Sequence, residues 1–246
     1  MATSLAQKAH PEALLQRAAW FHLLAMGFWY PWPGHGAALL ESLRRAPRPP
    51  GRLLADRALR RAFSAVENAW DGATAEGLRI EYARLFLGAS PAAAHETAYG
   101  DARRIAGRVV ELADVSGFYT AFGFKLSEED PGLPDHLATE LEFYSLLLLK
   151  QADAASASRR NAGSITRQAA SRFMDYHLGR WVSAFQAGLI EHHASPAYRT
   201  LGVLLSTLVG QECRCLRIAP RLLSGRLPTD FVQEDGFECP QAVAPS

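Results

Sequence analysis

One stripe of apolar residues, just past the middle of the chain, constrains the fold more than any other feature of the sequence. Apolar side chains recur there at i, i+4, i+7 and i+11, the spacing of one side of an α-helix. They are Leu137, Leu141, Tyr144 and Leu148. A helix with such a stripe has to bury it against other elements, so the pattern predicts a core helix that runs to about residue 152.

The start of this helix is marked by Pro134, Asp135 and His136. Proline has no backbone N–H to donate, and aspartate favours the N-cap because its carboxylate can accept from the backbone N–H two or three residues on. We therefore expect Asp135 to be the N-cap and the helix to begin at His136. From the residues alone, two interpretations of the Asp–His pair stay open. It is either a plain helix start or the polar rim of a binding groove.

Helical spacing recurs along most of the chain, whereas the alternation of β-branched residues that is typical of strands is scarce. Further helices are predicted over residues 11–30, 34–45, 52–70, 73–88, about 105–123, 165–189 and 196–218. In the 105–123 helix, the expected buried face consists of Ile105, Val109, Leu112, Ser116 and Tyr119. Residues 153–163 are small and polar, which predicts a mobile connection.

These elements predict an all-α fold. We expect a single-domain helical bundle of roughly seven to eight or more helices, with a core over about residues 10–220 and a loosely ordered tail over about 224–246. The length of 246 residues is sufficient to bury a substantial core. The chain is expected to be a monomer or a dimer that exchanges helices at a hinge over residues 153–163.

Composition excludes several classes of partner. The net charge is +1, which gives no electrostatic signal for nucleic acid or for an anionic membrane. The most apolar early segment, residues 18–30, is too short to span a bilayer and lacks the flanks of an export signal. We therefore expect a cytoplasmic protein with no nucleic-acid partner and no stable membrane insertion.

Catalytic and metal-binding motifs were sought in the sequence. It contains no phosphate-binding Gly-x-x-x-x-Gly-Lys loop, no Gly-x-Ser-x-Gly and no His-Glu-x-x-His. Three cysteines, with His192 or His193, have the composition of a zinc site, and they are Cys213, Cys215 and Cys239. However, residues two apart on a helix point away from each other, so we expect these cysteines to hold no metal. Because the sequence shows no group of acid, base or nucleophile, we also expect no cofactor and no enzyme activity.

Several motifs together resemble the TorD/DmsD family of redox-enzyme maturation chaperones, to which the NarJ proteins are related. They stand in order over roughly residues 10–210, and comprise the helix Glu81–Gly88, the loop His95–Tyr99, the segment Tyr119–Phe124 followed by an acidic loop and Pro134–Leu137, and the helix Phe173–Trp181. The chain departs from the family pattern at His95, where an aromatic residue is usual, and at Leu133, near where glutamate is often found.

The resemblance implies an all-helical, non-catalytic chaperone in the cytoplasm. Such a protein binds the twin-arginine signal peptide and the catalytic subunit of a molybdenum enzyme, and delays export until the cofactor has been inserted. The alternative is a helical assembly or regulatory subunit that binds another protein. A helical enzyme is a third class, which no group of acid, base or nucleophile supports.

The resemblance also indicates which residues would contact the client. A signal peptide's apolar segment needs a groove of leucine and aromatic side chains, for which the candidates are Tyr82, Leu85, Phe86 and Tyr99. Its arginines need acceptors, for which the candidates are Asp135, His136, Glu96 and the acidic loop at residues 128–130. For Tyr82 and Leu85, a plain core position is the open alternative.

Overall fold

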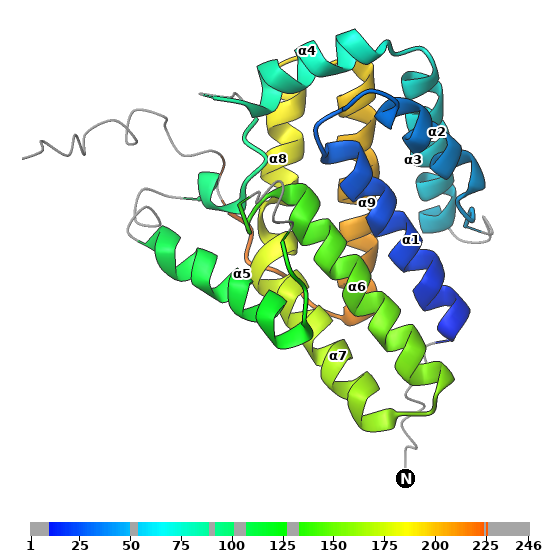
Figure 1. Cartoon of the computed structure of the whole chain (residues 1–246), viewed down its shortest axis with the longest axis vertical. Helices are drawn as coiled ribbons and strands as arrows, with labels where there is room; N and C mark the ends of the chain where they lie inside the picture. The colour runs from blue at the N-terminus through cyan, green and yellow to red at the C-terminus, as the bar shows by residue number, and fades with distance from the viewer. Residues whose placement is uncertain are drawn as a thin grey trace, which may run out of the picture.

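The computed structural model describes residues 10–49, 54–88, 92–100, 107–126, 133–223 and 225. Within these ranges the regular elements are all helical (Figure 1). They are α1 (Pro11–Phe28), α2 (His35–Arg45), α3 (Leu54–Asp71), α4 (Ala75–Phe86), the 3₁₀ helix η1 (Glu96–Ala98), α5 (Arg108–Phe122), α6 (Leu137–Ser156), α7 (Arg160–Phe173), the π-helix η3 (Met174–Leu178), α8 (Gly179–Glu191) and α9 (Pro196–Leu216). The predicted all-α class is confirmed.

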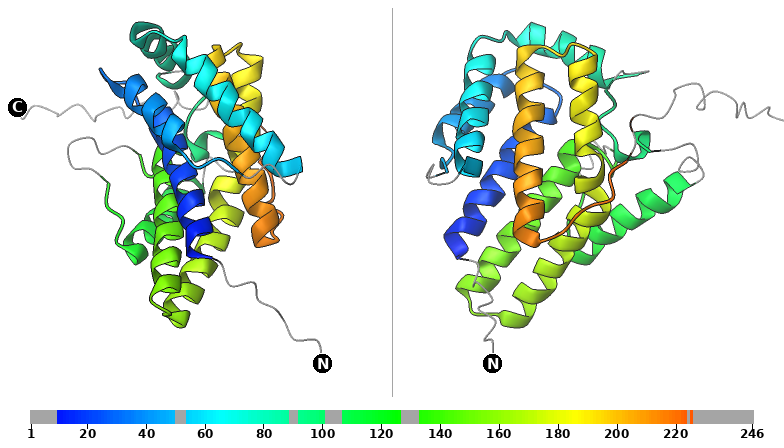
Figure 2. Two further views of the ribbon diagram at one scale, coloured as in Figure 1. Left: turned by 90° about the vertical axis from the view of Figure 1, so that its right-hand side faces the viewer. Right: turned by 180° about the vertical axis from the view of Figure 1, so that it is seen from behind.

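Helices α1 and α6 lie side by side and antiparallel at the centre of the bundle (Figure 1). The Ser145 hydroxyl donates to the carbonyl of Ala18 at 2.9 Å, and the rings of Phe21 and Tyr144 are 4.7 Å apart. Helix α9 lies behind α1 and runs beside α8 (Figure 2). A Cβ atom at Gly27 would lie 2.8 Å from a methyl group of Leu201, so glycine is what allows α1 and α9 to approach this closely.

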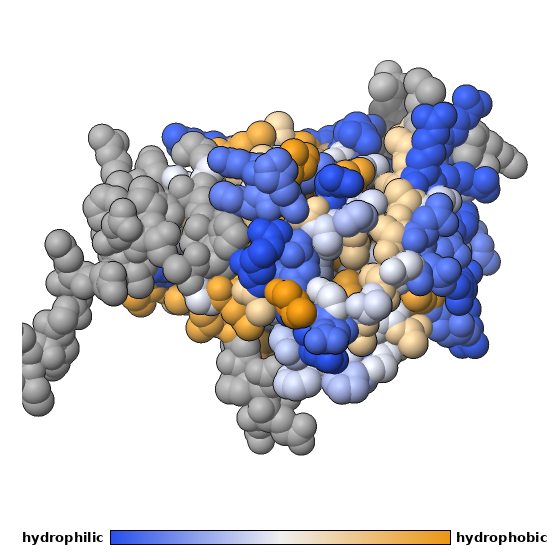
Figure 3. Space-filling view, turned by 90° about the horizontal axis from the view of Figure 1, so that it is seen from above, coloured by the Kyte–Doolittle hydropathy of each residue, from blue (hydrophilic) through white to orange (hydrophobic). Residues whose placement is uncertain are grey.

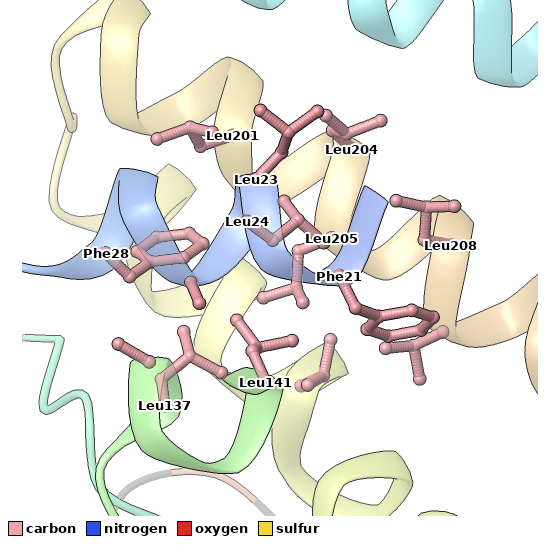
Figure 4. Packing of buried hydrophobic residues seen from close by; sticks show 14 of the residues in the cluster. Phe21, Leu23, Leu24, Phe28, Leu137, Leu141, Leu201, Leu204, Leu205 and Leu208 are labelled. Atoms are coloured by element: carbon pink, nitrogen blue, oxygen red, sulfur yellow. The ribbon is translucent and has the colours of Figure 1, made fainter. Parts of the chain in front are cut away.

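The core is formed where these three helices meet (Figure 4). Its side chains are no more than 4% exposed, and those labelled in the figure are Phe21, Leu23, Leu24, Phe28, Leu137, Leu141, Leu201, Leu204, Leu205 and Leu208. Burying each of them contributes about 1.5–3 kcal/mol relative to an exposed position. The stripe predicted for the central helix is confirmed, because Leu137, Leu141, Tyr144 and Leu148 are all fully buried.

The remaining helices cover the ends and flanks of this core. Helix α3 packs on α9, where the Trp70 indole N–H donates to the carbonyl of Ala197 at 3.1 Å. Helix α4 crosses the upper end of the molecule (Figure 1). Among the described residues, no helix is both long and apolar enough to cross a lipid bilayer.

Two local predictions are wrong. Residues 153–163 are not a loose connection, because α6 continues to Ser156, α7 begins at Arg160, and three residues make the turn. Ser158 has a φ of 56°, and Asp153 pairs with Arg159 across the turn, which explains how small polar residues close a tight helical hairpin. The predicted loosely ordered tail, like Cys239, lies almost entirely outside the described residues.

The predicted buried face of the 105–123 helix is wrong in part. Tyr119 is buried as predicted, but Val109 is 77% exposed, Leu112 and Ser116 are only half-buried, and the other buried residue of α5 is Val115. Ile105 lies outside the described residues. Helix α5 lies at the edge of the bundle (Figures 1 and 2), so only one side of its middle part packs against other helices.

Candidate functional site

Two of the sequence motifs, one around His95 and the other around Asp135, pair with each other in space. His95 and His136 form an isolated antiparallel bridge. The backbone N–H of Glu96 donates to the carbonyl of Asp135 at 3.0 Å, and that of Leu137 donates to the carbonyl of Ala94 at 2.8 Å. A loop and a helix start that are 40 positions apart are thereby joined, which the sequence alone did not predict.

Asp135 is not the N-cap of α6, so this prediction is wrong. Its carboxylate is fully buried and accepts from the backbone N–H of Thr97 at 3.1 Å, the Thr97 hydroxyl at 2.7 Å and His95 Nδ1 at 3.3 Å. Burial by itself raises the pKa of Asp135, but the hydrogen bonds from His95 and Thr97 outweigh it, and the pKa is lowered. Asp135 therefore anchors the loop of His95 to the start of α6 as an ionised carboxylate.

The N-cap is His136, and α6 begins at Leu137. The Nδ1 atom of His136 accepts from the backbone N–H of Ala138 at 3.2 Å, which requires that this nitrogen carry no proton. Burial, with the charge of neighbouring His95, lowers the pKa of His136 to about 3, so the ring is neutral at physiological pH. Its face stacks on Trp29 with ring centres 5.3 Å apart, and the Trp29 indole donates to Glu142 at 3.0 Å.

His177 joins three elements of the structure. Its Nδ1 lies 3.0 Å from a carboxylate oxygen of Glu96 on η1, and its Nε2 lies 3.1 Å from one of Asp114 on α5. His177 belongs to η3, and π-turns of this kind are frequent at functional sites. A Cβ atom at Gly179 would lie 2.3 Å from the Met174 carbonyl oxygen, so the turn needs glycine there. The sequence motif contained His177, but its two partners were not foreseen.

Glu140, on the first turn of α6, is fully buried. One of its oxygens accepts from the Trp181 indole at 3.3 Å, and the other has no hydrogen-bond partner among the described residues. Burial, with the negative charges of Glu96 and Asp135, raises the pKa of Glu140 well above its ordinary value and so favours the protonated carboxyl. Glu140 belongs to none of the motifs on which the family resemblance rests.

We call these residues together the polar network. Its members are His95, Glu96, Thr97, Asp114, Asp135, His136, Glu140, His177 and Trp181. It reaches solvent at two ends, because the side chain of His95 is 27% exposed and that of Asp114 is 63% exposed. The acidic loop at residues 128–130, which was expected to add acceptors, lies outside the described residues.

The apolar candidates Tyr82, Leu85 and Phe86 lie in a separate aromatic cluster under α4, and none is more than 6% exposed. Seen from above, hydrophilic and hydrophobic residues are interspersed on this end of the molecule (Figure 3). Tyr99 is also buried and packs on Trp181 at 5.3 Å, next to the polar network. The core alternative left open for Tyr82 and Leu85 fits these positions.

One chain of aromatic contacts connects the cluster under α4 to the surface. Tyr82 contacts Tyr30 at 5.3 Å, and Tyr30 contacts Trp32 at 4.7 Å. Trp32 is 62% exposed and stands in the loop after α1, three residues from the Trp29 that stacks on His136. The loop residues 29–32 therefore contact both the polar network and the aromatic cluster.

The cysteines do not form a metal centre in the part of the chain that the structure describes. No group of three or more His, Cys, Asp or Glu residues is placed there to hold a metal ion. Cys213 is half-buried and Cys215 is exposed. Burial, with the charge of Glu212, raises the pKa of Cys213 to about 11, so this thiol stays protonated.

Comparison with known proteins places the polar network inside a recognised region. The family model of the nitrate reductase delta subunit matches residues 52–187, a range that contains every member of the polar network. The selenate reductase assembly chaperone protein of Thauera selenatis is 36% identical over 150 residues, 61% of this chain and 76% of the relative. The chlorate reductase assembly chaperone protein of Ideonella dechloratans is 34% identical over 134 residues, 54% of this chain and 68% of the relative.

Proposed function

Because the chain belongs to the nitrate reductase delta subunit family, we propose that it is an assembly chaperone for the catalytic subunit of a molybdenum oxidoreductase. The membership confirms the family of redox-enzyme maturation chaperones that the motifs indicated. The relatives are named as chaperones and not as catalysts, in agreement with the prediction that the chain is not an enzyme. Two relatives serve a selenate and a chlorate reductase by name, so the proposed client is an oxyanion reductase.

The proposed mode of action is recognition of the client's twin-arginine signal peptide in the cytoplasm. The chaperone would hold this peptide while the cofactor is inserted and release it for export afterwards. The recognition step requires acceptors for guanidinium groups and an apolar surface close by. A partner of another kind remains the alternative.

One observation carries the proposal, namely the pairing of the His95 and Asp135 motifs into a buried acidic network that opens at His95. The carboxylate of Asp135 lies directly behind this opening, 3.3 Å from His95, and favours an approaching cation. Exposed Trp32 offers an aromatic face to an arginine or to the peptide's apolar part. In this proposal Asp135 and His136 act by holding His95 and Trp29 in place.

The other candidate residues would act from beneath the surface. Tyr82, Leu85 and Phe86 support the loop of residues 29–32 through the contact of Tyr82 with Tyr30, and Glu96 and Tyr99 support the loop of His95. Each of these five side chains is at least nine-tenths buried, so direct contact with a peptide would require a local opening. We therefore propose that they shape the site and that His95, Trp29 and Trp32 touch the client.

Calorimetric titration tests this function. The folded protein is titrated with synthetic signal peptides of the molybdoenzymes encoded in the same genome, and with matched peptides in which both arginines are replaced by alanine. We expect one peptide to bind per chain, and the alanine version to bind about tenfold or more weakly because charge-assisted hydrogen bonds are lost. Folded protein that binds none of these peptides would contradict the proposal.

Recovery of the partner from cells separates the alternatives. A molybdoenzyme catalytic subunit that copurifies with the chain supports the chaperone role. A different stable partner, with no molybdoenzyme subunit present, would indicate an assembly or regulatory subunit instead.

A further inference from the structure

A row of aromatic rings leads from the His95 opening to a carboxylate that lies outside the polar network. His95 meets His136 edge to face with ring centres 5.0 Å apart, and His136 stacks on Trp29 at 5.3 Å. The Trp29 indole then donates to a carboxylate oxygen of Glu142 on α6 at 3.0 Å. Glu142 therefore ends the row that His95 begins, and both side chains are half-buried.

We propose that Glu142 accepts a hydrogen bond from one arginine of the client's signal peptide, and that Trp29 holds the Glu142 carboxylate in position for this contact. The inference rests on the proposed function and adds a contact residue to the same site. In this role Glu142 determines specificity, because it favours a client side chain that carries a positive charge over a neutral one.

The charge of Glu142 has no cation beside it in the part of the chain that the structure describes. Its carboxylate has one hydrogen-bond partner there, the Trp29 indole, and forms no ion pair. Glu67, which is also half-buried, shows the usual arrangement, because it pairs with Arg48 at 2.8 Å. A carboxylate that has lost part of its hydration without gaining a charged partner favours the approach of a guanidinium group.

The titratable side chains around Glu142 do not supply the missing positive charge. Burial, with the charge of neighbouring His95, lowers the pKa of His136 to about 3, so this ring is neutral. Burial, with the charges of surrounding carboxylates that include Glu142, raises the pKa of Tyr119 well above its ordinary value, so this phenol is neutral as well. The negative charge of Glu142 is therefore available to a partner.

The geometry of the carboxylate suits an arginine. Trp29 occupies one oxygen of Glu142, whereas the other has no hydrogen-bond partner among the described residues and reaches solvent. An indole has its N–H at the edge of the ring, so the carboxylate lies beside the ring and not over its face. A guanidinium group is planar, and it can donate to a carboxylate while it packs against an aromatic side chain. Lysine has no such planar group, so the arrangement favours arginine.

Glu142→Gln tests the contact. Glutamine keeps an oxygen that can accept from Trp29 but carries no charge, so the variant should fold normally, which circular dichroism checks. Calorimetric titration uses the signal peptide that the wild-type protein binds. We expect Glu142→Gln to bind this peptide about tenfold or more weakly, because a charge-assisted hydrogen bond is lost.

Glu12→Gln is the matched control. It removes the same charge from the other end of α1, roughly 25 Å from Trp29 given the helical rise per residue, and its side chain is 88% exposed. Any effect of net charge alone should therefore be the same in both variants. Glu12→Gln is expected to bind the peptide within about twofold of wild type.

Peptides in which each arginine is replaced singly by alanine identify the partner of Glu142. For the peptide that lacks this partner, wild-type protein and Glu142→Gln should bind equally, because the contact is already absent. For the other single replacement, Glu142→Gln should still bind about tenfold or more weakly than wild type. An equal loss with both replaced peptides and with the original one would show that Glu142 contacts neither arginine.

The experiment separates this inference from the proposed function. Equal affinity of Glu142→Gln and Glu12→Gln for the original peptide, with wild-type binding intact, would overturn the assignment of Glu142 and leave the proposed function standing. A wild-type protein that binds no signal peptide would overturn both.

Discussion

The core between α1, α6 and α9 and the interior of the polar network are both inaccessible to water, but they differ completely in chemistry. In the core, leucine and phenylalanine side chains fill the space, and none of those labelled in Figure 4 is more than 4% exposed. In the polar network, Glu96, Asp135 and Glu140 are fully buried and His177 is 1% exposed. Helix α6 belongs to both regions. It contributes leucines to the core, and its N-cap His136 and first-turn Glu140 to the polar network.

This difference separates what stabilises the fold from what serves binding. Apolar burial is favourable in proportion to area, whereas removing a carboxylate from water costs several kcal/mol before any partner is counted. Well-packed hydrophobic residues often stabilise a protein more than a buried ionic group of similar volume. We infer that the polar network is kept for client binding and for holding α5 in place, and that most of the stability comes from the core.

The largest expected contrast between the two regions appears in acid. The pKa of His136 is about 3 in the folded protein, against about 6.5 for an ordinary histidine, so the unfolded chain binds more protons between these values. The contribution of neutral His136 to the free energy of unfolding is therefore complete above pH 6.5. It is lost as the pH falls towards 3, by about 5 kcal/mol in total. The lowered pKa of Asp135 further reduces the free energy of unfolding in more acidic solution. The raised pKa of Glu140 has the opposite effect, because the folded protein then binds the additional proton.

Urea unfolding at pH 6.5 and pH 4.5 checks this expectation. His136→Asn is the matched variant, because asparagine caps a helix well but does not titrate. We expect the wild type to lose about 2–3 kcal/mol over this interval and His136→Asn to lose clearly less. An identical loss in both proteins would show that His136 is not the group responsible.

The next effect is a cavity in the core. Leu205 is fully buried on α9, so Leu205→Ala should lower the free energy of unfolding by about 2–5 kcal/mol. Client affinity should stay within about twofold of wild type while the variant is folded, since α9 contributes no member of the polar network. Chemical denaturation measures the free energy of unfolding, and peptide titration measures the affinity. A large loss of affinity would contradict the proposal that the core serves stability and the polar network serves binding.

A smaller loss of stability is expected at the π-turn that positions His177. In Gly179→Ala the new methyl group meets the Met174 carbonyl, so the turn has to shift, at a cost of about 1–3 kcal/mol. The shift should also displace His177 from Glu96 and Asp114 and loosen α5. Hydrogen exchange of α5 amides, compared with that of α9 amides, measures the local effect. Equal changes in both helices would contradict a role confined to the polar network.

Asp135→Asn is expected to lower stability about as much as Gly179→Ala. The amide keeps the shape of the carboxylate but loses its charge, and one of its two ends donates where Asp135 only accepts, so we expect a loss of about 1–3 kcal/mol. Client affinity should fall as well, because His95 loses the partner that holds it at the opening. A variant with normal affinity would return Asp135 to a purely structural role. Thermal unfolding and titration with the same peptide make the comparison.

The sequence predicted the core better than the polar network, for a physical reason. Helical periodicity reports burial directly, so Leu137, Leu141 and Tyr144 were identified correctly. It failed at Val109, because α5 lies at the edge of the bundle and its exposed side carries apolar residues. Turn formation at residues 157–159 was missed because small polar residues suit both a tight turn and a loose linker.

The site was predicted only in part because its partners are distant in sequence. Asp135 and His136 were singled out correctly as polar residues at a helix start, but the capping role was assigned to the wrong one of the two. Aspartate is the commoner cap, and here the competing hydrogen bonds from Thr97 and His95 take its carboxylate. The burial of Glu140 could not be predicted, since a glutamate in the first helical turn is ordinary and its burial depends on tertiary packing.

The most direct test measures unfolding free energy and client affinity in two variants, one from each region. Leu205→Ala removes core volume, and Trp32→Ala removes an exposed side chain at the opening of the polar network. The separation of stability from binding predicts a loss of about 2–5 kcal/mol of stability with near-normal peptide affinity for Leu205→Ala. It predicts a change of less than about 0.5 kcal/mol with at least about tenfold weaker binding for Trp32→Ala. Near-normal peptide binding by Trp32→Ala, or weakened binding by folded Leu205→Ala, would contradict it.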